Sequence, residues 1–210
     1  FFQLGMLMCR DALERNESVV FEGAAGAAQI QKLSDSYGAN PPKEVDGSAV
    51  VSVRDFPKPG ILFRDITPVL EDPLLCRAIT QGFRERLQDT PIDAIAGIES
   101  RGFLFGMPLA LALGVPFLTV RKKGKLPWRT VSYKYDLEYA SAEVEMHVDS
   151  VSPGMRVLVH DDLLATGGTA AAAAELVRMQ GGLVSGFSFL IELSFLDGLR
   201  KLESYNAKVV

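Results

Sequence analysis

The chain has 210 residues, of which 48% are hydrophobic, and a formal net charge of −4 at pH 7. This length fits one α/β domain with an appendage rather than two full domains, and the hydrophobic content is sufficient for a full core. The acidic balance argues against a general nucleic-acid binder, which would show a basic excess.

Cysteine usage and apolar run length predict the compartment. Cys9 and Cys76 have neither metal-ligand nor CxxC spacing, which is typical of a reducing compartment. No apolar run reaches the ~18 residues of a membrane span. The first residues also lack the basic stretch that opens a signal peptide. We therefore expect a cytoplasmic protein with no membrane partner.

The first 47 residues differ in composition from the rest. They contain a predicted short helix at 6–15, a low-complexity Gly/Ala stretch at 23–28 and a breaker cluster at 38–42. We find no chemistry in this part. The sequence therefore predicts an N-terminal extension over 1–47, partly helical or loop, and one main domain over 48–210.

From residue 50 onward the pattern alternates between strands and helices. Asp72 and Pro73 suit the N-cap and first position of a helix ending near residue 87. Further helices are predicted at 103–113, 170–180 and 196–203, and strands at 92–98, 115–120, 143–148, 157–160, 184–193 and from 207. The polar segment 124–139 is predicted to be a mobile hairpin loop. This alternation predicts an α/β fold with a parallel sheet.

The run RVLVHDDLLATGGT at 156–169 is the most informative stretch. It reads as a buried parallel strand that ends in Asp161 and Asp162. A turn of five small residues follows, and then an Ala-rich helix; the turn is Ala165, Thr166, Gly167, Gly168 and Thr169. A glycine-rich turn at a helix N-terminus binds anions, and ligands of open α/β sheets lie at the carboxyl ends of the strands. The turn therefore suits a phosphate and the carboxylates suit ribose hydroxyls; an ordinary turn beside a solvated strand end is the alternative.

His160 precedes the two aspartates, so a transition-metal site is another interpretation. Consecutive strand residues point to opposite faces and cannot all face one ion. We therefore predict no protein-held metal here, and expect His160 to be a half-buried neutral histidine at a strand end.

Two further segments carry positive charge near predicted strand ends. Glu99, Ser100 and Arg101 form a strand-to-helix turn, and arginine binds phosphate in a bidentate manner. In isolation, an ordinary capped helix with an exposed arginine is the favoured interpretation. The basic run at 121–125 suits a multiply charged anion, and a solvated basic run or a targeting patch is its alternative.

These motifs resemble, in the same order, those of the type I phosphoribosyltransferases, which use phosphoribosyl pyrophosphate (PRPP). The similarity runs from about residue 56 to residue 193, and DDLLATGGT is most similar to the members that use adenine. The segment PGILFRD at 59–65 resembles the family's purine-binding hood. Phe63 can stack on the base, and the backbone at Leu62 and Arg64 can read its exocyclic amine. The LEY at 137–139 resembles the end of the family's lid loop.

The resemblance implies transfer of the 5-phosphoribosyl group from PRPP to N9 of adenine, giving AMP and pyrophosphate. It implies a type I core with a small hood and a flexible lid loop, Mg²⁺ bound mainly through PRPP and water, and a homodimer. It assigns Glu138 to purine proton handling, although a single loop glutamate is usually only a surface residue. It assigns pyrophosphate binding to Ser100, Arg101, Arg121, Lys122 and Lys125, and implies a cis peptide between Glu99 and Ser100.

The chain departs from the family pattern at three positions: His160 replaces an aliphatic residue, Glu99 replaces Asp, and Trp128 replaces a Gly. The last departure predicts a stiffer loop. The family also completes a strand near residue 210, so we expect the C-terminal strand to be cut short. Two alternatives remain open: a sister enzyme for a 6-oxopurine or orotate, and a non-catalytic nucleotide-sensing regulator, which would carry a DNA-binding extension.

Overall fold

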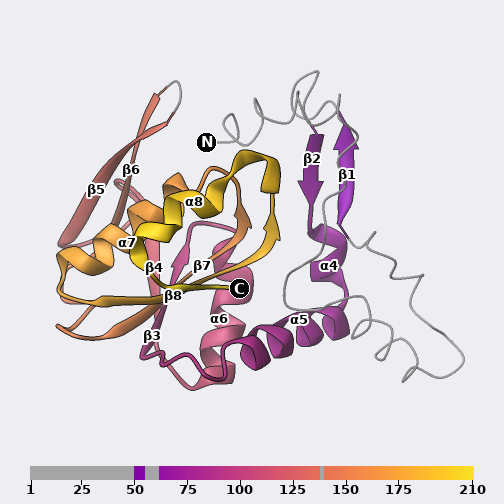
Figure 1. The fold of residues 1–210 in the computed structure, drawn as a ribbon, viewed down its shortest axis with the longest axis horizontal. Helices are drawn as coiled ribbons and strands as arrows, with labels where there is room; N and C mark the ends of the chain where they lie inside the picture. The colour runs from indigo at the N-terminus through magenta and orange to yellow at the C-terminus, as the bar shows by residue number, and fades with distance from the viewer. Residues whose placement is uncertain (1–49, 55–61, 138–139) are drawn as a thin grey trace, which may run out of the picture.

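The computed structural model describes residues 50–54, 62–137 and 140–210. The predicted extension over 1–47 and the expected turn at 56–60 lie outside the described residues. Figure 1 shows a central twisted sheet with helices on both faces. None of the helices in the described ranges is long and apolar enough to cross a membrane.

The main sheet has seven strands in the order β5-β6-β4-β3-β7-β8-β9. Its strands are β3 (Ala94–Ile98), β4 (Phe117–Lys122), β5 (Thr130–Leu137), β6 (Ala140–His147), β7 (Arg156–Leu164), β8 (Leu183–Glu192) and β9 (Lys208–Val209). In the order β4-β3-β7-β8-β9 all neighbouring strands are parallel. At the other edge, β6 pairs antiparallel with both β4 and β5. The predicted parallel sheet is confirmed, with an antiparallel hairpin added to it.

The described part of the chain contains five α-helices: α4 (Thr67–Glu71), α5 (Pro73–Arg86), α6 (Gly102–Leu113), α7 (Gly168–Met179) and α8 (Gly198–Leu202). Helices α5 and α6 cover one face and α7 and α8 the other (Figure 1). The predicted start of α5 is confirmed, because the Asp72 carboxylate accepts hydrogen bonds from the Leu74 and Leu75 backbone N–H groups. The helix predicted at 196–203 is only partly α-helical, with 3₁₀ turns on either side of α8.

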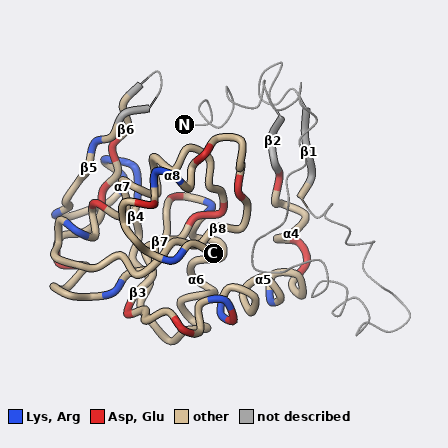
Figure 2. Tube along the Cα trace, in the orientation of Figure 1, with Lys and Arg blue, Asp and Glu red and all other residues tan. Residues whose placement is uncertain are grey.

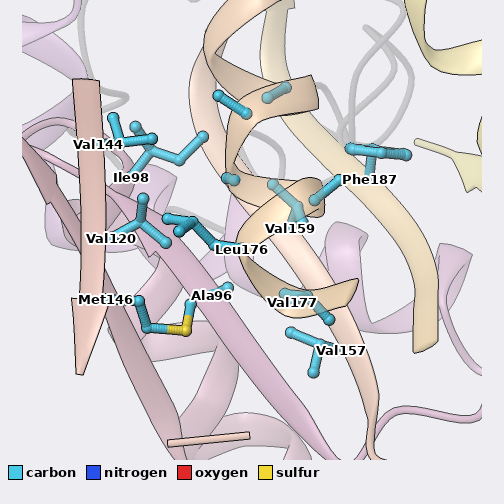
Figure 3. Packing of buried hydrophobic residues seen from close by; sticks show 14 of the residues in the cluster. Ala96, Ile98, Val120, Val144, Met146, Val157, Val159, Leu176, Val177 and Phe187 are labelled. Carbon is cyan, nitrogen blue, oxygen red and sulfur yellow. The ribbon is translucent and has the colours of Figure 1, made fainter. Parts of the chain in front are cut away.

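Alternation along the central strands divides the core into two layers. Val157 and Val159 pack toward α7, whereas Leu158 between them packs toward α5 and α6. Figure 3 shows the α7 side, where Leu176 and Val177 of the helix meet the two valines. Because both faces are buried, the carboxyl edge of the sheet is the natural place for a ligand.

The segment 124–139 differs from its prediction as a mobile loop. Residues Thr130–Leu137 form an eight-residue strand paired along its whole length with β6. Its odd-numbered residues Val131, Tyr133 and Tyr135 pack against the core, so a period of two was present in the sequence. The segment was interpreted as a loop because of its polar content, although polar residues are the other half of this alternation.

The β7 strand is longer than predicted, because it continues beyond His160 to Leu164. Both aspartates therefore lie inside the strand, and Asp161 pairs with Phe189 of β8. A separate two-stranded antiparallel sheet, β1 (Val51–Arg54) with β2 (Leu62–Asp65), stands beside α4 (Figure 1). The predicted hood residues Leu62, Phe63 and Arg64 are in β2; their side chains are outside the description.

Candidate active site

The β7–α7 connection has the strand, turn and helix order expected from the sequence. Helix α7 begins at Gly168, and its N-cap Gly167 has φ 73°, a left-handed conformation that favours glycine. A Cβ on Gly167 would also lie 2.5 Å from the Gly198 carbonyl oxygen. Glycine is therefore required here, and the turn presents the first backbone N–H groups of α7 to an anion.

Asp161 and Asp162 lie directly before this turn. Asp162 is 3% exposed, and its Oδ2 is 3.0 Å from Arg101 Nε. Burial and the adjacent Asp162 carboxylate raise the pKa of Asp161. Burial also raises the pKa of Asp162, and Arg101 opposes that rise. The two carboxyl groups therefore titrate as a coupled pair.

Arg101 reaches the acidic pair because α6 starts very close to β7. Strands β3 and β7 are parallel neighbours, so the turn after β3 and the turn after β7 emerge at the same edge. A Cβ on Gly102 would lie 2.8 Å from the His160 carbonyl oxygen, so only glycine allows this approach. The Glu99–Ser100 peptide is cis, as the resemblance implied.

Arg121 is held by Glu99 rather than projecting freely from the strand end. Its Nε and Nη2 lie 3.1 and 3.2 Å from the two Glu99 carboxylate oxygens. The Lys122 backbone N–H donates to the same carboxylate, at 3.1 Å. Burial opposes the effect, but these hydrogen bonds and the guanidinium keep the pKa of Glu99 below its usual value. The glutamate that replaces the family's aspartate therefore joins the first turn to the basic run.

Sequence reasoning missed Glu145, which organises the rest of that run. This side chain is 2% exposed and accepts hydrogen bonds from the Lys125 and Leu126 N–H groups, each at 2.9 Å. It also accepts one from the Thr130 hydroxyl at 3.0 Å. These bonds outweigh burial and lower the pKa of Glu145. Alternation on β6 was the available signal, but it did not mark this glutamate as buried.

His160 is fully buried, and not half-buried at a strand end as expected. Its Nδ1 is 2.8 Å from the Ser188 hydroxyl, and Phe83 packs against the ring edge-on. Burial lowers the pKa of His160 to about 3, so the ring is neutral as predicted. The expectation of partial exposure was wrong because β7 continues past His160 and α6 covers it. Within the described ranges, no three His, Cys, Asp or Glu side chains form a metal-binding group.

The remaining predicted site residues are spread over the same region of the fold. Ser100 and Lys125 are exposed, and Lys122 is half-buried at the end of β4. Glu138 lies between the ends of β5 and β6, outside the described residues. The structure thus brings together the turn 165–169, the acidic pair and Arg101, while Arg121 is already engaged by Glu99.

A mostly parallel sheet with an anion-binding glycine turn and paired carboxylates at its carboxyl edge defines an α/β protein of the sugar-phosphate-binding class. Residues 66–192 match the family model described as the phosphoribosyl transferase domain. The chain belongs to the phosphoribosyltransferase family. The resemblance inferred from its motifs is therefore confirmed.

Several curated relatives are adenine phosphoribosyltransferases. The one from Cytophaga hutchinsonii is 51% identical over 158 residues, which cover 75% of this chain and 87% of the relative. The one from Anaeromyxobacter dehalogenans is 55% identical over 150 residues, which cover 71% of this chain and 87% of the relative.

Solved structures of the same enzymes have a similar fold. Adenine phosphoribosyltransferase from Thermoanaerobacter pseudethanolicus has a TM-score of 0.75 at 48% identity, covering 78% of this chain and 94% of its own. The Saccharomyces cerevisiae enzyme, complexed with an imino-altritol bisphosphate and adenine, has a TM-score of 0.74 at 39% identity. That match covers 88% of this chain and 98% of the yeast chain.

Proposed function

We propose that this chain transfers the 5-phosphoribosyl group of PRPP to N9 of adenine, forming AMP and releasing pyrophosphate in purine salvage. The observation that carries the proposal is the acidic pair Asp161–Asp162 directly before the anion-binding turn of α7. The chain is also about half identical to enzymes named for adenine.

The ribose phosphate is assigned to the β7–α7 connection. The 5′-phosphate lies on the turn 165–169, where backbone N–H groups and the helix dipole favour a negative charge. Asp161 and Asp162 accept hydrogen bonds from the ribose hydroxyls. The pyrophosphate is assigned to Ser100, Arg101, Lys122 and Lys125, with Arg121 contributing charge from its position against Glu99.

The base is assigned to the hood and the hairpin. The backbone at Leu62 and Arg64 reads the adenine amine, and Phe63 stacks on the ring. Glu138 handles the purine proton as N9 attacks the ribose C1. Catalysis then requires alignment of N9 with C1, neutralisation of the departing pyrophosphate, and exclusion of water by the hairpin.

Magnesium is proposed as a component of the PRPP complex. Mg²⁺ prefers phosphate and water oxygens as ligands, and PRPP supplies several phosphate oxygens. Such an ion would supply positive charge that offsets the charge of the pyrophosphate. Asp161 and Asp162 would be the nearest carboxylates of the proposed site to such an ion, and could accept hydrogen bonds from water bound to it.

A homodimer is proposed from the outer face of α6. Leu104, Met107 and Leu111 follow one helical face and are 42%, 45% and 71% exposed. An apolar stripe of this kind is typical of a protein interface.

Basic and acidic residues are interspersed along the described chain (Figure 2), which agrees with small-molecule rather than nucleic-acid partners. We also propose the division into a 1–47 extension and a 48–210 domain, and a cytoplasmic location.

The test is a side-by-side assay of the purified chain with PRPP, Mg²⁺ and one of four bases: adenine, hypoxanthine, guanine or orotate. AMP formation with adenine, at least about 100-fold more efficient than any other product, is expected, because a site that hydrogen-bonds one base leaves polar groups unpaired with the others. Preference for another base would replace the proposal with a sister enzyme. PRPP binding without turnover on any base would indicate a regulator.

A further inference from the structure

Tyr135 joins the β5–β6 hairpin to the phosphate turn. Its hydroxyl is 3.1 Å from the Thr169 hydroxyl in the first turn of α7. Its ring lies 3.7 Å from the position that a Cβ on Gly168 would occupy. The side chain is only 9% exposed, although it belongs to an edge strand. The hairpin is therefore anchored at the α7 N-terminus.

The electrostatic setting keeps Tyr135 protonated. Burial raises the pKa of Tyr135, the nearby Asp161 carboxylate adds to this, and only the Thr169 hydrogen bond opposes it. A neutral phenol can donate its hydrogen throughout the physiological pH range. Tyr135 is thus a permanent donor beside the first turn of α7.

The direction of the Tyr135–Thr169 hydrogen bond follows from what the turn binds. A phosphate dianion only accepts hydrogen bonds, and the Thr169 hydroxyl has one hydrogen to give. Once that hydrogen points at the phosphate, the Thr169 hydroxyl can only accept in its contact with Tyr135. Tyr135 is the donor in place, so the two bonds polarise each other in the same direction.

We infer that Tyr135 is a positioning residue that directs the Thr169 hydroxyl at the 5′-phosphate of PRPP and so couples phosphate binding to the hairpin. The inference rests on the proposed function, which assigns the 5′-phosphate to this turn. Tyr135 pairs with Ala142 on β6, close to the end of the hairpin at residues 138 and 139. Phosphate on the turn therefore stabilises the hairpin in the position that the Tyr135–Thr169 contact fixes.

The first experiment compares Tyr135→Phe with Tyr133→Phe, which removes a hydroxyl from the same face of the same strand. Steady-state kinetics gives KM for PRPP, KM for adenine and kcat, and calorimetry gives the Kd for ribose 5-phosphate. Tyr135→Phe is expected to raise both the PRPP KM and the ribose 5-phosphate Kd about 3- to 10-fold, as for loss of one hydrogen bond. KM for adenine and all Tyr133→Phe values are expected to match those of the unchanged chain.

The second experiment tests whether Tyr135 acts through Thr169. The Tyr135→Phe effect is expected to persist in a Thr169→Ser background, which keeps the hydroxyl, and to vanish in Thr169→Val, which lacks it. An equal effect in both backgrounds would overturn the inference, since tyrosine would then act only through packing. Unchanged PRPP and ribose 5-phosphate values in Tyr135→Phe would overturn it as well.

The two readouts separate this inference from the proposed function. If the unchanged chain binds ribose 5-phosphate, and Tyr135→Phe weakens that binding, the inference stands even where no AMP forms from adenine. If AMP forms but Tyr135→Phe behaves like the unchanged chain, only the inference fails. If the unchanged chain does not bind ribose 5-phosphate, the assignment of the turn fails and the inference fails with it.

Discussion

At the residue scale, the site is built from carboxylates with different tasks. Asp161 and Asp162 lie before the anion-binding turn, whereas Glu99 and Glu145 face the basic segment and fix its backbone. Burial raises the pKa values of the two aspartates, but hydrogen bonds lower those of the two glutamates. The first pair is thus suited to bind a ligand and the second pair to hold a loop.

Replacing either aspartate is expected to weaken use of PRPP without unfolding the chain. Asp161→Asn and Asp162→Asn keep the side-chain volume but remove an acceptor oxygen from the proposed contact with the ribose hydroxyls. Hydrogen bonds to charged groups contribute about 1.5–3 kcal/mol, so kcat/KM for PRPP is expected to fall about 10-fold or more. Kinetics and thermal unfolding together check this. Unchanged PRPP kinetics in both variants would remove the pair from the site.

Replacing Glu145 is expected to loosen the basic loop and destabilise the fold. Glu145→Ala leaves the Lys125 and Leu126 N–H groups without their acceptor, at a cost of about 1–3 kcal/mol. Glu143→Ala is the matched control, because Glu143 is on the same strand and more exposed. Chemical denaturation measures both; equal stability losses in the two variants would show that the Glu145 contacts contribute nothing of their own.

The same residue implies a pH dependence. The pKa of Glu145 is lower in the folded chain than in the unfolded chain, so its contribution to the unfolding free energy is complete above the ordinary glutamate value of about 4.3. That contribution is lost as the pH falls through the lowered value. A Glu145→Gln chain is therefore expected to lose less stability than the unchanged chain below about pH 4.

At the element scale, the β4–β5 connection holds one residue against its backbone preference. Trp128 has φ 67°, a left-handed conformation, and its side chain is 89% exposed. Left-handed backbone costs a residue with a Cβ about 1–2 kcal/mol, which exposed tryptophan packing does not offset. The stiffer loop expected from Trp128 is therefore accompanied by a local loss of folding free energy.

Trp128→Gly is consequently expected to raise the unfolding free energy by about 1 kcal/mol. Trp128→Ala is the control, because it removes the ring but keeps the Cβ and so the backbone cost. Thermal and chemical unfolding of the three chains distinguish them. A gain in Trp128→Ala equal to that in Trp128→Gly would assign the effect to the exposed ring instead.

The hairpin β5–β6 is expected to behave as a lid despite its regular pairing. Its two strands pair along eight residues, and Tyr135 anchors it beside the first turn of α7. Amide hydrogen exchange in 132–142 is expected to slow when PRPP is added, because the phosphate stabilises the anchored state. Identical exchange and protease resistance with and without PRPP would contradict a lid.

At the scale of the whole molecule, the apolar face of α6 predicts self-association. Leu111 is the most exposed of its large side chains, and replacement by glutamate would place a charge in the proposed dimer interface. Leu111→Glu is expected to shift the chain from dimer to monomer in analytical ultracentrifugation, with little change in the monomer fold. The matched control is Met179→Glu, at an exposed position of α7, which is expected to leave the dimer intact.

The sequence alone determined those features whose parts are neighbours along the chain. The acidic pair, the glycine turn and the start of α7 are contiguous, so their spacing and chemistry could be read directly. The Asp72 cap of α5 was predictable for the same reason, because capping depends on the next few backbone N–H groups. Family identity also followed from such local runs.

Only the tertiary structure decided which distant side chains meet. The Arg101–Asp162 ion pair requires β3 and β7 to be neighbours, and the Tyr135–Thr169 bond joins residues 34 apart in the chain. Glu145 is buried among loop N–H groups because β6 pairs with β4 in one register. Hydrophobic periodicity specifies which face of a strand is buried, but strand order and register arise from the packing of the whole sheet, and these place the groups that position the site.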